Sequence, residues 1–227
     1  MTLGTEYPEH PILMGPAMII AKRAGIKHMT RRTSGLSVIN TALRDYDLVR
    51  LEHDRNNTAI GVFRNKRSGK ELLIPCPFGG PGHSLWWREG WHTDKALDHL
   101  KPCELSPHHA RIYYNGDYDR DLPAAAGRFR APFHLPRWAA RFVDPVESVT
   151  LERLQDITAE DAVLEGMMTH YGARGASYYN YLSDGEDNAW LSCPRQSFFS
   201  LWIMINGAEA LVENPFVWAI KFKKAEQ

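Results

Sequence analysis

The sequence predicts an α+β fold built round a small β-barrel or a strongly bent sheet. Several segments alternate between apolar and polar residues, as half-buried strands do. Segments with helical spacing are few and short. No internal repeat is evident in the sequence. Strands therefore carry most of the expected core.

We expect a single domain over residues 1–227 with two insertions. A chain of 227 residues favours one elaborated domain, and a hydrophobic content of 44% is enough to bury a core. The first insertion, at about residues 33–80, carries a β-hairpin. The second, at about 92–130, is rich in His, Pro, Asp and Tyr, so we expect it to be mostly irregular.

The N-terminal part predicts a strand, a helix and then the first insertion. A short apolar strand at Pro11–Pro16 precedes a helix at Ala17–Ala24, which Gly25 ends. The insertion has three strand-like runs separated by turn residues. They are Tyr46–Glu52, Thr58–Arg64 and Glu71–Ile74.

The middle of the chain contains an unusual run of tryptophans. Ser84–Trp91 holds three of them and is predicted to be a strand near the centre of the sheet. Only Ala110–Tyr114 resembles a strand in the second insertion. Val146–Arg153 alternates again and predicts a further strand.

The C-terminal part predicts two helices, a loop and a last strand. Thr158 begins an approximate capping box, and Gly166 ends that helix. Residues 169–195 are polar and rich in Tyr, Gly and Asp, so a loop is expected. An apolar helix at Ser197–Asn206 and a strand at Phe216–Lys223 complete the chain.

Charge and cysteine usage limit the class of protein. Lys+Arg and Asp+Glu both number 27, so the chain lacks the excess positive charge that drives non-specific coating of nucleic acid. The three cysteines are widely spaced and do not indicate a disulfide framework. No N-terminal signal is visible, and the most apolar window, Phe198–Ile205, is too short to span a bilayer. We expect a cytoplasmic protein without membrane contact.

Nothing in the sequence predicts a metal or a cofactor. Cys76, Cys103 and the nearby histidines lack the spacing of a zinc site. Gly79–Gly82 lacks the Lys-Ser/Thr ending of a phosphate loop and does not open a helix.

The octapeptide Gly25–Arg32 is the strongest chemical signal. Lys27 can act as a base if it is desolvated, and a nearby hydroxyl such as that of Thr30 can then act as a nucleophile. Arg31 and Arg32 can hold phosphate or carboxylate groups. A basic surface turn explains the same residues at least as well, so local sequence leaves both interpretations open.

Two further features of the sequence also allow two interpretations each. The tryptophans at 86, 87 and 91 can stack on a nucleobase, although core packing is the commoner role for such residues. Glu165 lies at the end of a predicted helix, where it is either solvated or directed into a pocket near a cation.

Six segments, taken in order, resemble the phage and prophage branch of the ASCH domain family. The resemblance covers a little under half of the chain and neither insertion, and it implies a PUA-like small β-barrel. The segments are Ile12–Pro16, Gly25–Arg32, Pro81–Trp91, His134–Arg141, Val149–Gly166 and Asn214–Trp218.

Three positions are also similar to a bacterial branch of this family that hydrolyses N4-acetylcytidine. The resemblance implies that Lys27 accepts a proton, Thr30 is the nucleophile and Glu165 donates a proton to the leaving group. His28 stands where both branches usually have Thr, and His83-Ser84 stands where phage members usually have Asp-Arg. The candidate substrate-binding residues are Arg31, Arg32, Trp86, Arg88, Glu89, Trp91 and Arg137.

Two expectations of function follow from these observations. The first is an amidohydrolase whose substrate is a small modified nucleoside. It needs a partly neutral Lys27 and a Glu165 that is protonated or shares a proton, because an ionised Glu165 raises the pKa of Lys27. The second is a non-catalytic module that binds RNA or a nucleotide, or a phage accessory protein acting in the cytoplasm of the bacterial host.

Overall fold

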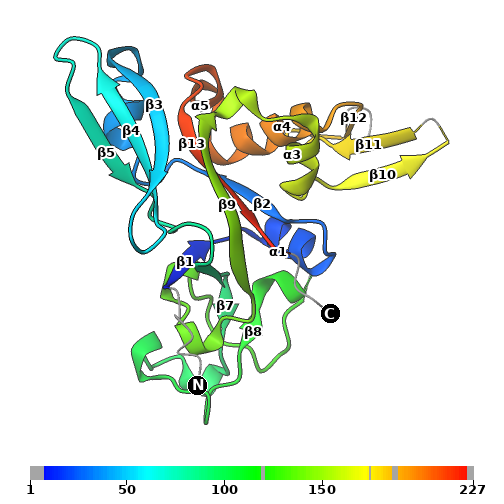
Figure 1. The fold of residues 1–227 in the computed structure, drawn as a ribbon. Helices are drawn as coiled ribbons and strands as arrows, with labels where there is room; N and C mark the ends of the chain where they lie inside the picture. Colours follow the sequence, from blue (N-terminus) through cyan, green and yellow to red (C-terminus); the bar gives the residue numbers. More distant parts are fainter. Residues whose placement is uncertain (1–7, 119–120, 174, 186–188, 224–227) are drawn as a thin grey trace, which may run out of the picture.

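A computed structural model describes residues 8–118, 121–173, 175–185 and 189–223 of the chain. Its central element is a five-stranded sheet in which segments from both ends of the chain lie side by side (Figure 1). β1 runs parallel to β6, and the other neighbouring strands are antiparallel. In order across the sheet the strands are β1 (Glu9–Leu13), β6 (Ser84–Arg88), β9 (Val143–Arg153), β13 (Phe216–Phe222) and β2 (Met29–Arg32).

The two long middle strands lie where the sequence predicts strands, and β9 confirms the alternation predicted for Val146–Arg153. β9 is buried at nearly every second residue from Asp144 to Leu151, which is typical of a strand with one face on the core. β13 is buried at every position except Lys221, because it lies between β9 and β2 with both faces covered. Trp218 and Ile220 therefore anchor the core of the whole chain.

The sheet is open among the described residues, so the α+β class is confirmed but a closed barrel is not found. β1 and β2 are the two edges, and each pairs with one neighbour. A side chain bridges these edges where a barrel would have backbone pairing. Nη2 of Arg32 donates to the carbonyl oxygen of Leu13 at 2.7 Å.

The first insertion forms a three-stranded antiparallel sheet at the positions that the sequence predicts. Its strands are β3 (Tyr46–His53), β4 (Ala59–Asn65) and β5 (Glu71–Pro75). Gly61 of β4 approaches the main sheet so closely that a Cβ there would lie 2.5 Å from Leu151. The insertion therefore shares the main hydrophobic core.

The predicted loop at 169–195 is wrong. β10 (Thr169–Gly172), β11 (Gly175–Tyr179) and β12 (Trp190–Leu191) form a small antiparallel sheet that projects from the body of the molecule (Figure 1). None of the described residues in these strands is fully buried, so the strands show no clear apolar alternation.

The predicted strand Ser84–Trp91 is also corrected. β6 ends at Arg88, and β7 (Trp91–His92) pairs with β8 (Tyr113–Tyr114) instead of continuing the sheet. A Cβ at Gly90 would lie 2.7 Å from the Phe129 ring, so the chain changes direction at a position that tolerates no side chain. Trp91 then anchors a second, smaller hydrophobic cluster in this region.

The helices are short, as predicted. Five α-helices are described, at Pro16–Arg23 (α1), Ser37–Asn40 (α2), Ala159–Leu164 (α3), Pro194–Asn206 (α4) and Ala208–Val212 (α5). Single 3₁₀ turns occur at Leu43–Asp45, Lys95–Leu97, Pro102–Glu104, Asn115–Asp117, Pro132–His134, Arg137–Ala139 and Leu154–Asp156. In the described ranges none of the helices combines the length and the apolar character needed to cross a membrane.

Candidate active site

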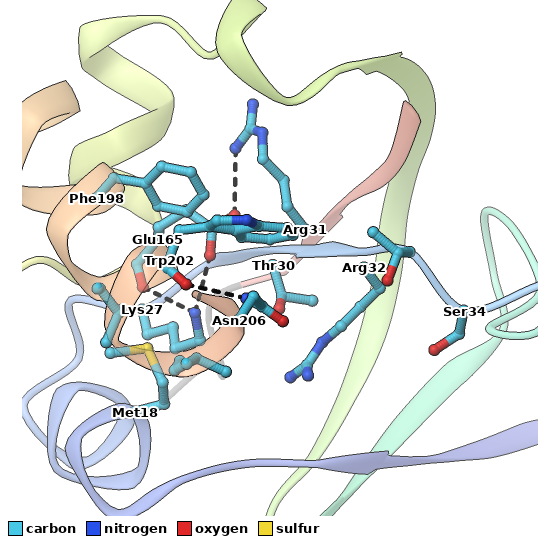
Figure 2. Close-up of a pocket in the computed structure, with 13 residues that line it drawn as sticks. Met18, Lys27, Thr30, Arg31, Arg32, Ser34, Glu165, Phe198, Trp202 and Asn206 are labelled. Carbon is cyan, nitrogen blue, oxygen red and sulfur yellow. Dashed lines mark hydrogen bonds and ion pairs between the residues drawn. The ribbon is translucent and has the colours of Figure 1, made fainter. Parts of the chain in front are cut away.

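A pocket of about 160 Å³ lies where β2, the end of α3 and one side of α4 meet (Figure 2). Lys27, Thr30 and Glu165 all contribute to its wall, so the structure brings the three predicted catalytic residues together. The remaining lining residues are Met18, Arg31, Arg32, Thr33, Ser34, Phe198, Leu201, Trp202, Ile205 and Asn206.

Lys27 is almost completely buried, with 1% of its surface exposed. Its Nζ donates to the carbonyl oxygens of Met29 (2.9 Å) and Glu165 (2.7 Å) and to Oε2 of Glu165 (3.1 Å). Burial lowers the pKa of Lys27, the negative charge of Glu165 partly offsets that effect, and the positive charges of Arg32 and Arg31 lower the pKa further. Because burial is the largest of these effects, Lys27 releases its proton more easily than a solvated lysine.

Glu165 reaches the pocket from the end of α3. The Thr158 hydroxyl accepts the backbone N–H of Asp161 at 3.0 Å, which confirms the predicted cap at the start of this helix. Gly166 follows with φ of +88°, and a Cβ there would lie 2.9 Å from Cβ of Lys27. A glycine at this position therefore lets the end of α3 lie directly against the Lys27 backbone.

Arg31 holds three carboxylates around the site. Its Nη1 lies 3.2 Å from Oε1 of Glu165, and its Nη2 lies 2.6 Å from Oε1 of Glu152 and 2.8 Å from Oδ2 of Asp161. Burial alone lowers the pKa of Arg31, but the charges of Glu165 and Glu152 outweigh it and the pKa is raised. Arg31 is thus a permanent cation that orients Glu165, with its guanidinium already engaged by the protein.

Thr30 lies in the middle of β2, where its backbone pairs with Ile220 of β13. Only 3% of its surface is exposed, and within the described chain its hydroxyl has no hydrogen-bond partner. A strand thus presents a hydroxyl to the same pocket as the Lys27 amine. Burial of Lys27, Thr30 and Arg31 excludes the alternative of a basic surface turn.

Arg32 is the one arginine of the pocket with no ion pair in the part of the chain that the structure describes. Nη2 contacts the Leu13 carbonyl and the Met14 sulfur, whereas Nε is buried without a partner. Burial lowers the pKa of Arg32 and the charge of Glu165 partly offsets this effect. The Arg32 guanidinium therefore has donor capacity left for a ligand.

One side of α4 forms the apolar wall of the pocket, which sequence reasoning missed. Phe198 and Trp202 lie next to Glu165 in Figure 2, and the two rings are 6.1 Å apart. The indole Nε1 of Trp202 is buried and has no partner among the described residues. The helical spacing of Phe198, Leu201, Trp202 and Ile205 did reveal an apolar face, but such a face usually indicates core packing.

Five predicted substrate-binding residues do not line this pocket. Trp86, Arg88, Glu89 and Trp91 belong to β6, β7 or their connection, and β9 and β13 separate β6 from β2 in the sheet. The Trp86 ring lies under the guanidinium groups of Arg88 (4.3 Å) and Arg137 (5.9 Å).

The other predicted substrate-binding residues make contacts elsewhere in the protein. Glu89 is buried against Arg141 at 2.7 Å, and Arg137 binds Glu9 at 2.6 Å. Trp91 is fully buried in the second hydrophobic cluster, so its ring has no face open to a base.

The described residues contain no group of three His, Cys, Asp or Glu side chains placed to hold a metal ion. Burial raises the pKa of the Cys76 thiol to about 12, so this cysteine stays protonated and unreactive. No family model, curated protein or solved structure matches the chain.

Proposed function

We propose that this protein is an amidohydrolase that removes the acyl group from N4-acetylcytidine or a related N-acylated nucleoside. The observation that carries the proposal is the meeting of Lys27, Thr30 and Glu165 in one buried pocket. The resemblance to the ASCH family suggested the same three residues, and a PUA-like fold is part of this proposal. Three free cysteines, Cys76, Cys103 and Cys193, fit the reducing cytoplasm that we propose as its location.

The reaction starts from neutral Lys27 and protonated Glu165. This state carries the same net charge as the ion pair, and burial of Lys27 favours its neutral form. The Thr30 hydroxyl gives its proton to Nζ of Lys27 while Oγ1 attacks the acyl carbonyl carbon. Glu165 donates its proton to the leaving N4 of cytosine, the C–N bond breaks, and cytidine departs from an acyl-Thr30 ester.

Water then completes the cycle. Its oxygen attacks the ester carbon while its proton passes to the Glu165 carboxylate, and Oγ1 of Thr30 leaves with the proton held by Lys27. The carboxylic acid departs, and the starting protonation state returns. Arg31 stays charged throughout and keeps the Glu165 carboxyl in place through the 3.2 Å contact.

The pocket lining fits a flat heterocycle beside a polar reaction centre. The rings of Phe198 and Trp202 supply an apolar surface on which a base can stack. The free N–H of Trp202 and the unpaired Nε of Arg32 are donors, which suit the acceptor atoms O2 and N3 of cytosine.

An RNA-binding module without catalysis has less support. That role needs arginines free to contact phosphate. Three of its five candidates, Arg31, Arg137 and Arg141, are paired with carboxylates, which leaves Arg32 and Arg88 without an ion pair among the described residues. A small neutral substrate fits this charge distribution better than a phosphate backbone does.

The test measures release of cytidine from N4-acetylcytidine by chromatography. Thr30→Val replaces the hydroxyl by a methyl group of similar size and should lower kcat by at least about 100-fold. Thr30→Ser should keep measurable activity. Thr150→Val, at an exposed position of β9 that does not line the pocket, should leave kcat close to wild type. The proposal fails if the wild-type protein hydrolyses no N4-acyl cytidine, or if Thr30→Val is as active as wild type.

A further inference from the structure

A second pocket lies in the region of the second insertion, away from the candidate active site. It has a volume of about 350 Å³ and shares no residue with the first pocket. Figure 1 shows this region, around β7 and β8, at the opposite end of the molecule from α4 and α5. The lining residues are Pro102, Arg128, Phe129, Arg130, Ala131 and His134.

Arg130 is the central cation of this pocket, with 4% of its surface exposed. Its Nη1 and Nη2 donate to the carbonyl oxygens of Leu100 and Leu97, each at 3.0 Å, and its guanidinium lies 5.3 Å from the Trp91 ring centre. In the described ranges Nε has no partner and no carboxylate forms an ion pair with Arg130. A buried cation without a counter-ion is costly, which is a physical reason to expect a bound anion.

The charges around Arg130 do not supply the counter-ion that it lacks. Burial lowers the pKa of Arg130, the positive charge of Arg128 lowers it further, and Asp98 partly offsets both effects. The two carboxylate oxygens of Asp98 accept the backbone N–H of Arg128, at 2.9 and 3.0 Å, and among the described residues Asp98 forms no ion pair with Arg130. Among the described residues, no acidic side chain lines the pocket.

The rim of the pocket combines cations with exposed aromatic rings. Phe129 and Phe133 are each 57% exposed, which is unusual for such large apolar side chains. The Phe133 ring lies 3.9 Å from that of His134, and Arg128 and His134 are both exposed to solvent. Aromatic faces beside arginines are the pattern by which proteins stack nucleobases next to their phosphates.

We propose that this pocket binds the phosphate group of a nucleotide, with Arg130 and Arg128 as its principal cations and Phe129 or Phe133 stacking on the base. Arginine suits this ligand because its planar fork of N–H donors matches two phosphate oxygens. The site is independent of the proposed hydrolysis, since it uses none of the residues around Lys27. The phosphate belongs either to a free nucleotide or to a nucleic-acid strand.

The experiment titrates the full chain with cytidine 5′-monophosphate, cytidine and inorganic phosphate, using calorimetry. We expect saturable binding of the monophosphate, competition by inorganic phosphate and much weaker binding of cytidine. The double variant Arg128→Ala/His134→Ala removes two exposed side chains and should weaken monophosphate binding by at least about tenfold. Arg55→Ala, an exposed arginine in the turn between β3 and β4, is the matched control and should bind as wild type does.

Further arms identify the source of the phosphate and guard against binding elsewhere. A nucleic-acid strand is the ligand if a short single-stranded oligonucleotide binds more tightly than the monophosphate and its binding weakens as salt rises. A free nucleotide is the ligand if the monophosphate binds more tightly. Hydrolysis of N4-acetylcytidine should be unchanged in the double variant. The proposal is overturned if neither monophosphate nor phosphate binds saturably. It is also overturned if Arg32→Ala abolishes binding while the double variant does not.

Discussion

Nζ of Lys27 lies 3.1 Å from Oε2 of Glu165, although 138 positions separate the two residues in the sequence. Their side chains are only 2% and 5% exposed, so water screens the pair poorly. The contact joins the start of β2 to the end of α3 and shapes the polar side of the pocket. It therefore links the stability of the fold to the chemistry of the site.

The first prediction concerns the energetic coupling of this pair. Lys27→Met and Glu165→Gln each remove one partner of a buried pair, and each should cost about 3 kcal/mol of unfolding free energy. The double variant should lose less than the sum of the two, with a coupling energy of about 1–3 kcal/mol. Urea unfolding of wild type, the two single variants and the double variant gives the coupling energy.

Lys221 and Glu147 provide a matched control for that cycle. Their N–O distance is also 3.1 Å, but their side chains are 39% and 44% exposed. The cycle with Lys221→Met and Glu147→Gln should give a coupling below about 1 kcal/mol. Equal coupling in the two cycles would show that burial of Lys27 and Glu165 has no energetic consequence.

The second prediction is a pH dependence of stability due to Lys27. Burial lowers the pKa of Lys27 in the folded protein below its ordinary value of 10.5. Between the folded pKa and 10.5 the unfolded chain holds more protons at this site than the folded chain does. The unfolding free energy of wild type, relative to Lys27→Met, should therefore rise with pH through that window, with a slope of about 1.4 kcal/mol per pH unit.

Denaturant unfolding of both proteins at about pH 7 and about pH 10 measures this difference. A constant or falling difference would mean that ionised Glu165 dominates over burial. In that case the Lys27 ammonium would not release its proton readily enough for Lys27 to serve as the proposed base.

The third prediction uses two glycines with positive φ, Gly25 near Lys27 in the sequence and Gly166 packed against it in space. A Cβ at Gly166 would lie 2.9 Å from Cβ of Lys27 and 2.9 Å from Cβ of Ala21, whereas a Cβ at Gly25 would meet nothing within 4 Å. Gly25→Ala should cost about 1 kcal/mol from backbone strain alone. Gly166→Ala adds steric overlap and should cost about 3 kcal/mol.

The same variants separate stability from catalysis. Gly166→Ala pushes Lys27 away from Glu165, so kcat should fall by about 100-fold in protein that is still folded. Gly25→Ala should keep most of its activity. Thermal unfolding together with the hydrolysis assay checks both expectations, and equal kcat in the two variants would contradict the role given to Gly166.

The fourth prediction concerns the cap of α3. This helix has only six residues, and the Thr158 hydroxyl binds one of the free N–H groups of its first turn. Thr158→Ala should lower the unfolding free energy by about 1 kcal/mol, and Thr158→Asn should lower it much less because Asn is also a good cap. If both variants lose the same stability, the hydrogen bond to Asp161 is not the cause.

Local patterns in the sequence predicted the elements that are regular within themselves. β9 shows the alternation of a strand with one face on a core, β13 is a continuous apolar strand, and α3 begins after the expected capping residue. The same patterns gave no strand at β2, which is four residues long, and wrongly predicted a loop where β10 to β12 form. Periodicity needs several residues in a constant environment, and these strands lack either length or a uniformly buried face.

The resemblance to the ASCH family suggested Lys27, Thr30 and Glu165 as a set, but the sequence could not say what surrounds them. Arg31 was expected to hold substrate, yet it binds Glu152, Asp161 and Glu165, which come from β9, α3 and the end of α3. The aromatic wall was expected from the tryptophans of β6 and is supplied by α4. These differences arise because sheet order, not sequence order, decides which side chains are neighbours.

The amino-acid sequence was thus sufficient for the α+β class and most of the main strands, since each depends on interactions within a few positions. The shared pocket, the burial of Lys27 and its contact with Glu165 required the folded chain. β2 pairs with β13 at one edge of the sheet, and Glu165 reaches it from a helix more than a hundred residues away. Desolvation and charge pairing act through that three-dimensional arrangement, and they determine what a lysine and a glutamate can do.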